Sequence, residues 1–152
     1  MTCFGRPRWL ALGIALFLSI ALIPDLRAFS VTGNQMFSEG PYLFKMEVQV
    51  SGRGSLKKNP LQMTSLKVKI KNDRASSKPL TVKTIRAYID PQVYQDIETK
   101  GYPITPAQWV TKYYRLQKGK QPLLGEQASI EIAFETFTIR FNPRERKFQG
   151  PL

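Results

Sequence analysis

The chain has 152 residues, a formal net charge of +12 and no histidine, and its single cysteine is Cys3. The absence of histidine excludes the Ser-His-Asp and Cys-His nucleophile arrangements and every zinc or iron site that needs an imidazole ligand. The length suits one domain. Phe and Tyr residues spread along the chain supply the large apolar side chains that a core needs, so we expect a folded domain rather than disorder.

The first 28 residues predict an export signal or a short membrane anchor. Two arginines precede an uncharged apolar run at residues 9–23. As a helix, this run covers about 22 Å, short of the roughly 30 Å hydrocarbon core, which favours a signal peptide cleaved after Ala28. The alternative is an uncleaved anchor. In either form we expect residues 29–152, one basic β-rich domain without a thiol, to be exported to the periplasm, an equivalent lumen or the exterior.

Positive charge is concentrated in one part of this domain. From Lys45 to Arg86 there are eleven Lys or Arg residues against only Glu47 and Asp73. A field of one sign attracts anions and speeds encounters with them, and salt screens it. The charge therefore indicates an anionic membrane surface, an acidic protein of a membrane complex or an acidic glycan as partner. The alternative is a solvated surface that keeps the domain soluble.

Alternation of apolar and polar residues predicts the first strands. Residues 44–50 alternate strictly, and residues 66–71 alternate again with three lysines on the outer face. Residues 80–89 resume strand character, but the apolar phase slips between Val82 and Ile85, which predicts a bulge. Pairing these strands in order gives an antiparallel sheet with one wet face.

The middle of the chain predicts short helices. Asp90 is a helix cap followed by a proline, and Gly101 stands where a helix would end, so we expect a helix over residues 91–99. Residues 105–108 have capping-box spacing and predict a second helical turn. Residues 110–116 also suit a strand.

The C-terminal part returns to alternation. Residues 130–141 hold two alternating sets whose phase changes at Glu135, which predicts either one long bulged strand or a tight hairpin. Residues 144–152 read as a polar tail with a single anchor at Phe148.

Together these patterns predict a mainly β fold, a small antiparallel β-sandwich with one or two short helices. Residues 68–72, a polar loop and residues 79–82 resemble a pair of strands in immunoglobulin-like exported domains. The chain lacks the Cys-Trp-Cys core of true immunoglobulin domains.

No catalytic motif emerges. Ser55 and Lys58 have Ser-x-x-Lys spacing, but they lie in a loop with glycine and proline and without the companion motifs of such enzymes. Glu131 and Glu135 are expected to point to solvent. We predict a non-enzymatic domain with no cofactor and no metal; a low-turnover enzyme using carboxylates and lysines is the weaker alternative.

Two groups of residues are candidates for binding. The outward lysines of the second predicted strand are expected to meet an acidic surface together with two loop lysines. Residues 109–120 interleave aromatic rings with cations, which suits a membrane interface or a glycan, whereas nucleic acid is not expected for an exported domain. The alternative for Trp109, Tyr113 and Leu116 is a place in the core. The candidate binding residues are Lys57, Lys58, Lys67, Lys69, Lys71, Trp109, Lys112, Tyr113, Tyr114 and Arg115.

The sequence thus predicts an accessory or binding domain that engages an anionic membrane surface or an acidic partner, and as the alternative an acidic-glycan or cell-wall binding module.

Overall fold

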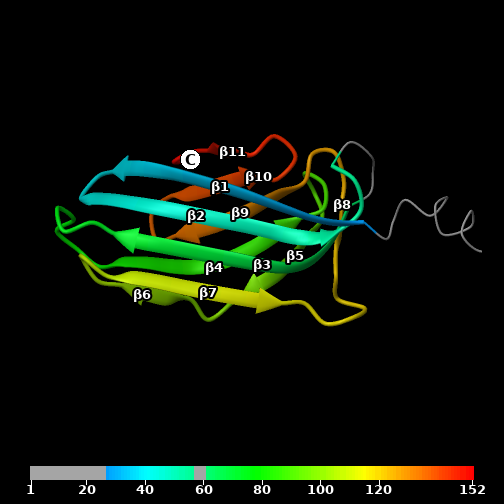
Figure 1. Cartoon of the computed structure of the whole chain (residues 1–152). Coiled ribbons are helices and arrows are strands. Elements are labelled where there is room, and N and C mark those ends of the chain that lie inside the picture. The colour runs from blue at the N-terminus through cyan, green and yellow to red at the C-terminus, as the bar shows by residue number, and fades with distance from the viewer. Residues whose placement is uncertain (1–26, 57–60) are drawn as a thin grey trace, which may run out of the picture.

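A computed structural model describes residues 27–56 and 61–152 of the chain, and this part is built of two antiparallel β-sheets (Figure 1). In the first sheet the strand order is β1-β2-β3-β7, and β8 also pairs with β3; in the second it is β11-β10-β9-β4-β5, and β6 also pairs with β4. The strands are β1 (Ala28–Glu39), β2 (Tyr42–Arg53), β3 (Leu61–Asn72), β4 (Leu80–Tyr88), β5 (Tyr94–Glu98), β6 (Tyr102–Ile104), β7 (Trp109–Arg115), β8 (Leu123–Leu124), β9 (Ser129–Phe134), β10 (Thr138–Asn142) and β11 (Lys147–Gln149).

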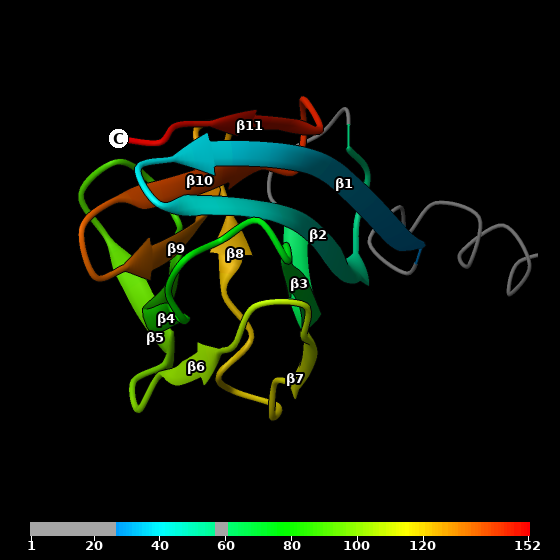
Figure 2. The ribbon, with the colours of Figure 1, turned by 90° about the vertical axis from the view of Figure 1, so that its left-hand side faces the viewer.

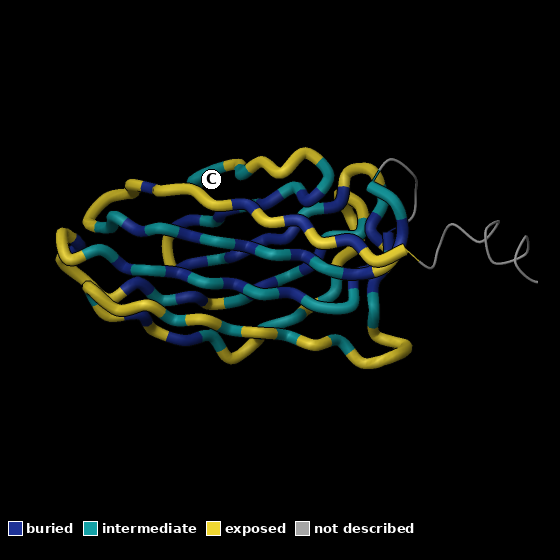
Figure 3. The backbone as a smooth tube through the Cα atoms, viewed as in Figure 1, coloured by how far each residue is buried: buried dark blue, intermediate teal, exposed yellow. Residues whose placement is uncertain are grey.

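The two sheets face each other across one apolar core. Figure 2 shows β2, β3 and β7 on one side and β4, β5 and β9 on the other. Along the strands buried residues alternate with more exposed ones, as the changing colours of Figure 3 show, because successive side chains of a strand point to opposite faces. The mainly β fold is therefore confirmed.

Aromatic rings fill one end of the core. Phe44 of β2 contacts Phe37 of β1 at a ring-centroid distance of 5.3 Å, and contacts Phe134 of β9 at 5.4 Å. These contacts join the sheets, since β1 and β2 belong to the first and β9 to the second. Phe148 of β11 closes the side of the core against Phe37 at 5.4 Å.

The prediction of one or two short helices is wrong for the described residues, which contain no helix. Residues expected to form the first helix instead form a tight turn and then β5, which pairs with β4 through Tyr88 and Tyr94. The cap itself is real, because Asp90 Oδ1 accepts hydrogen bonds from the backbone N–H groups of Gln92 and Val93. In this chain those bonds form a turn, and the residues that follow it form β5 and pair with β4.

The second predicted helical turn is also a reverse turn. Thr105 Oγ1 donates to Gln108 Oε1 at 2.9 Å, and the Gln108 N–H donates back to the Thr105 carbonyl at 3.0 Å. These contacts resemble those of a helix start, but Ala107 has a φ of 71°, outside the helical region, and β7 begins at Trp109.

Two predicted irregularities are present. The register between β4 and β9 shifts between Val82 and Thr84, which confirms the bulge. Residues 130–141 form the hairpin of β9 and β10 rather than one long strand. The expected polar tail is more ordered than predicted, since it contains β11, which pairs with β10 through Phe148 and Phe141.

Candidate functional site: the outer face of the first sheet

The three predicted lysines of β3 lie on the outer face of the first sheet. They alternate with Leu66, Val68 and Ile70, whose side chains are fully buried in the core. Because that phase places the apolar residues inward, Lys67, Lys69 and Lys71 point outward together.

The strands on either side of β3 extend this set into rows. Lys71 lies between Lys45 of β2 and Trp109 of β7. Lys67 lies between Gln49 and Tyr113 in the same way. Directly opposed residues of an antiparallel pair share a face, so the predicted lysines and the predicted aromatic residues form one surface.

Trp109 and Tyr113 are exposed on this surface rather than buried in the core. Their exposed fractions are 42% and 59%. The Nζ atoms of Lys69 and Lys71 lie 4.4 Å and 5.3 Å from the centroid of the Trp109 ring, within the range of cation–π contacts. The core alternative therefore fails for the two rings, whereas Leu116 does pack against the core.

We call this surface the basic face. Glu47 of β2, beside Lys69, is its single acidic residue among the described strands. The register places on it the cations Lys45, Arg53, Lys67, Lys69, Lys71 and Arg115 and the aromatic residues Trp109 and Tyr113.

None of these cations forms an ion pair with a described residue, whereas the ion pairs that do form lie on the second sheet. Across its outer face, Arg86 donates to Asp96 at 2.8 Å, and Arg140 contacts Glu131 at 3.0 Å through a guanidinium fork. Both guanidinium groups also lie over tyrosine rings. The expectation that Glu131 points to solvent is wrong in part, because its outward side chain is covered and only 9% of the residue is exposed. Arg86 and Arg140 of the second sheet are thus paired with acidic side chains, whereas the cations of the basic face are not.

Two predicted binding residues of β7 point the other way. Tyr114 turns toward the second sheet, where its hydroxyl donates to Glu98 Oε1 at 2.9 Å. Lys112 shares this side, and its Nζ lies 5.0 Å from the centroid of the Tyr102 ring. The structure therefore separates Lys112 and Tyr114 from the basic face. Lys57 and Lys58 lie outside the described residues.

The two tyrosines of this inner group are perturbed. Burial raises the pKa of Tyr102, and the negative charge of Glu98 raises it further. Burial likewise raises the pKa of Tyr114, with added contributions from Tyr102 and from the hydrogen bond to Glu98. On the exposed face the opposite holds: hydrogen bonding to Ser65, and then the nearby Arg115, lower the pKa of Tyr113.

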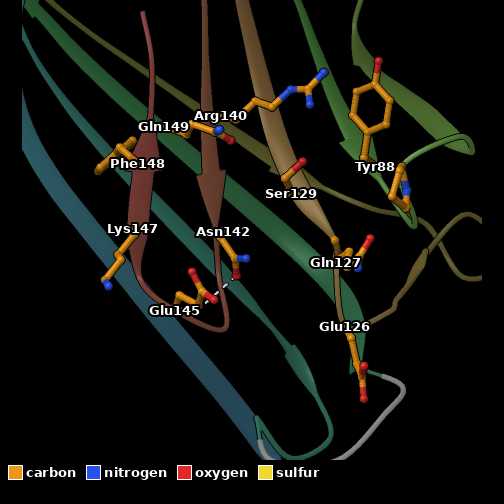
Figure 4. Close-up of a pocket in the computed structure, with 12 residues that line it drawn as sticks. Tyr88, Glu126, Gln127, Ser129, Arg140, Asn142, Glu145, Lys147, Phe148 and Gln149 are labelled. Carbon is orange, nitrogen blue, oxygen red and sulfur yellow. Dashed lines mark hydrogen bonds between the residues drawn. The ribbon is translucent and has the colours of Figure 1, made fainter. Parts of the chain in front are cut away.

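Two of the hollows on the surface of the described residues are lined by charged side chains. One, of about 510 Å³, lies over the second sheet beside the turn from β10 to β11 (Figure 4). Its lining mixes Arg140 and Lys147 with Glu126 and Glu145, and Figure 4 shows Glu126 pointing away from Glu145. The other hollow, of about 460 Å³, opens at one end of the basic face and is lined by both Arg53 and Arg115.

The described residues contain no cluster of acidic side chains that could hold a metal ion. Within the same residues, none of the secondary structure is a helix with the length and apolarity needed to span a bilayer. We compared the chain with family models, with curated proteins and with solved structures and found no match among them.

Proposed function

We propose that this chain is an exported, non-enzymatic binding domain that lies with its basic face against an anionic membrane surface. The observation that carries this proposal is the composition of that face: lysines and arginines without acidic partners surround two exposed aromatic rings on one sheet. Each basic residue near an anionic leaflet contributes about 1 kcal/mol of attraction. Trp and Tyr rings favour the headgroup region, where one side of the ring is apolar and the other is wet.

The geometry of the lysines supports a planar partner. Lys67, Lys69 and Lys71 are spaced two residues apart on one strand, so their ammonium groups follow a line along the sheet. Their stems are partly covered by neighbouring side chains, while long charged side chains keep their ends in water. A row of this kind contacts many dispersed anions at once, as a lipid surface presents them.

Sedimentation with vesicles tests the proposal. The protein is expected to pellet with phosphatidylglycerol vesicles at low salt, to remain in solution with phosphatidylcholine vesicles, and to be released as salt rises. The variant Lys67→Glu/Lys69→Glu/Lys71→Glu is expected to lose binding.

A matched control removes the same charge elsewhere. Lys78, Lys100 and Lys147 are exposed and lie away from the basic face, so their combined change to Glu should leave most of the binding intact. Equal loss in both variants, or binding that ignores salt, would show that the basic face has no special role. If the protein binds no vesicles and Lys69 crosslinks to one membrane protein, the partner is an acidic protein instead.

A second candidate is an acidic-glycan binding module, which the exposure of Trp109 and Tyr113 beside lysines favours. Such a module needs a free ring face for the sugar, and Lys69 and Lys71 lie over the Trp109 ring. If the chain is nevertheless such a module, Trp109→Ala should abolish retention on an acidic polysaccharide, while charge reversal at Lys67 and Lys69 should have little effect. The reverse pattern supports the membrane proposal.

We also propose an immunoglobulin-like topology for the sandwich. In that fold the second and fifth strands are neighbours in one sheet, and the third and sixth are neighbours in the other. If β2 is taken as the first strand, β3 and β7 correspond to the second and fifth strands, and β4 and β9 to the third and sixth. Both pairs are neighbours here, and β2 and β10 flank them as the first and last strands of that fold would. An experimental structure whose strand order separated β3 from β7 would contradict this assignment.

The non-enzymatic part of the proposal is supported by the chemistry that the chain lacks. Residues 29–152 contain neither histidine nor cysteine. The carboxylates Glu126 and Glu145 of the larger hollow do not point toward each other in Figure 4, as a pair that shares a substrate would.

A further inference from the structure

The smaller hollow is created by an irregularity in the first sheet. The register between β2 and β3 shifts at Ser51 and Gly52, so that Thr64 is an extra residue on β3. A side chain at Gly52 would overlap the carbonyl oxygen of Gln62, which means that only glycine allows the strands to approach as closely as they do here. Bulges bend a strand and redirect side chains, and this one lies where the basic face ends.

The charged residues that line the hollow have one sign. Arg53 of β2 and Arg115 of β7 line it, and so do the hydroxyl-bearing residues Ser65, Tyr113 and Thr64, of which Thr64 already donates to the Ser51 carbonyl. No described carboxylate lines it. The hollow over the second sheet, in contrast, contains two glutamates beside its cations. Two guanidinium groups with hydroxyl donors and no competing acid are suited to an anion with several oxygens.

We propose that the hollow lined by Arg53 and Arg115 is a binding site for a terminal phosphate group, which the membrane supplies as the headgroup of a phosphomonoester lipid. Arginine forks make paired hydrogen bonds to phosphate oxygens, and a terminal phosphate offers three of these. A volume of about 460 Å³ accommodates such a group with part of its ester. The inference deepens the proposed function by naming the lipid class, and its assignment to lipid rests on that function.

In the uncleaved form of the chain, the alternative to cleavage after Ala28, the position of the hollow supports the lipid source. Ala28, the first residue of β1, is part of its lining. The predicted apolar segment ends five positions earlier, at Ile23, and five residues span at most about 18 Å. If that segment is retained as an anchor, the hollow is held within this distance of the bilayer.

The central variant is Arg53→Gln/Arg115→Gln, whose two sites are both exposed, so the fold should tolerate the change. Arg74→Gln/Arg146→Gln removes the same charge from exposed arginines elsewhere and serves as the control. Binding is measured to vesicles containing phosphatidic acid and to vesicles containing phosphatidylglycerol, adjusted to the same surface charge. We expect the natural chain and the control to bind vesicles with phosphatidic acid roughly tenfold more tightly than vesicles with phosphatidylglycerol. The central variant is expected to lose this preference.

A second measurement locates the site without lipid. Inorganic phosphate, compared with chloride at matched ionic strength, is expected to shift the amide NMR signals of Gly52, Ser65 and Tyr113, and the central variant should abolish these shifts. If vesicles bind without lipid preference and phosphate shifts no signal at the hollow, the phosphate site is wrong while the proposed function stands. If phosphate shifts these signals but no anionic vesicle binds, the hollow takes a soluble phosphate compound, and both the lipid source and the membrane function are wrong.

Discussion

At the scale of single residues, Arg144 shows how one side chain joins distant segments. Its guanidinium donates to the backbone carbonyls of Leu56, Leu124 and Gly125 at 2.9, 3.1 and 3.1 Å. The Leu56 carbonyl belongs to the segment after β2, and the carbonyls of Leu124 and Gly125 belong to β8 and to the residue that follows it. Arg144 was predicted to lie in a polar tail, yet its contacts are structural.

Replacing Arg144 by Met keeps the length of the side chain and removes its donors. We expect the free energy of unfolding to fall by about 2–4 kcal/mol, because partly buried carbonyls lose their hydrogen bonds. Urea denaturation measures the change. Arg146→Met loses the same charge at an exposed position of the same turn and should change the stability by less than about 0.5 kcal/mol. Equal effects would show that Arg144 acts only through its charge.

At the scale of elements, β7 performs two tasks with its two sides. Its outer side contributes Trp109 and Tyr113 to the basic face. Its inner side places Tyr114 against Glu98 of β5 and Lys112 over the ring of Tyr102, so a polar group closes the gap between the edges of the two sheets. The Tyr102 hydroxyl is buried there and makes no hydrogen bond of good geometry with a described residue.

Because of Tyr102 and Tyr114, the free energy of unfolding is expected to depend on pH in the alkaline range. Burial raises the pKa of Tyr102 and Tyr114 above the ordinary value of 10.0. Above about pH 10 the unfolded chain releases these protons while the folded chain keeps them, so stability falls as the pH rises. We expect urea denaturation between about pH 9 and 11 to show a shallower decline in Tyr102→Phe/Tyr114→Phe.

The control for this prediction is Tyr94→Phe, which changes an exposed tyrosine and should decline like the natural chain. All other ionisable groups are the same in the three proteins, so their contribution to the pH dependence cancels in the comparison. Identical slopes in the double variant and the natural chain would show that the group does not couple ionisation to folding.

Elements were predictable from sequence where a strand alternates without interruption, as β2 and β3 do. The twelve-residue β1 was missed because Gly33 and Gln35 occupy inward positions and dilute its apolar pattern. Gly33 is required there, since a side chain would overlap the ring of Phe141. The helix predicted at residues 91–99 failed because a cap and a turn share the same local hydrogen bonds, and only pairing with β4 decides between them.

For a similar reason, the residues of the candidate site were predictable from the sequence, but their position on one surface was not. The lysines of β3 and the rings of β7 each have a recognisable local pattern, but they were interpreted as two surfaces. Their union depends on pairing between residues roughly 40 to 50 positions apart, such as Lys71 with Trp109, which no local pattern encodes. Arg53 is not among the candidate binding residues, because it stands between two glycines beside the predicted loop, although it is the last residue of β2.

At the scale of the whole molecule, cleavage or retention of the predicted export segment would set how the folded chain begins. Cleavage after Ala28 would leave Phe29 as the first residue, and Phe29 is buried in β1. It would also remove the hydrogen bond from the Gly54 N–H to the Arg27 carbonyl. The new amino group would lie beside Arg53, which pairs with Ala28, and would add positive charge near the hollow.

Intact-mass measurement of the protein from the cells that produce it decides between the two proposed forms. We expect a chain that starts at Phe29 and contains no cysteine. A mass that includes residues 1–28 would instead indicate a retained anchor, and the protein should then stay with the membrane fraction at high salt, even in the variant with three lysines of β3 changed to Glu.

The ion pairs on the outer face of the second sheet have a consequence for how the molecule would approach an anionic surface. With Arg86 and Arg140 paired to Asp96 and Glu131, and with the cations of the basic face unpaired, the centre of positive charge is displaced toward the first sheet. The molecule is therefore an electric dipole directed across its two layers. Near an anionic plane this dipole experiences a torque that turns the basic face toward the plane before contact, so salt should slow arrival more than it hastens departure.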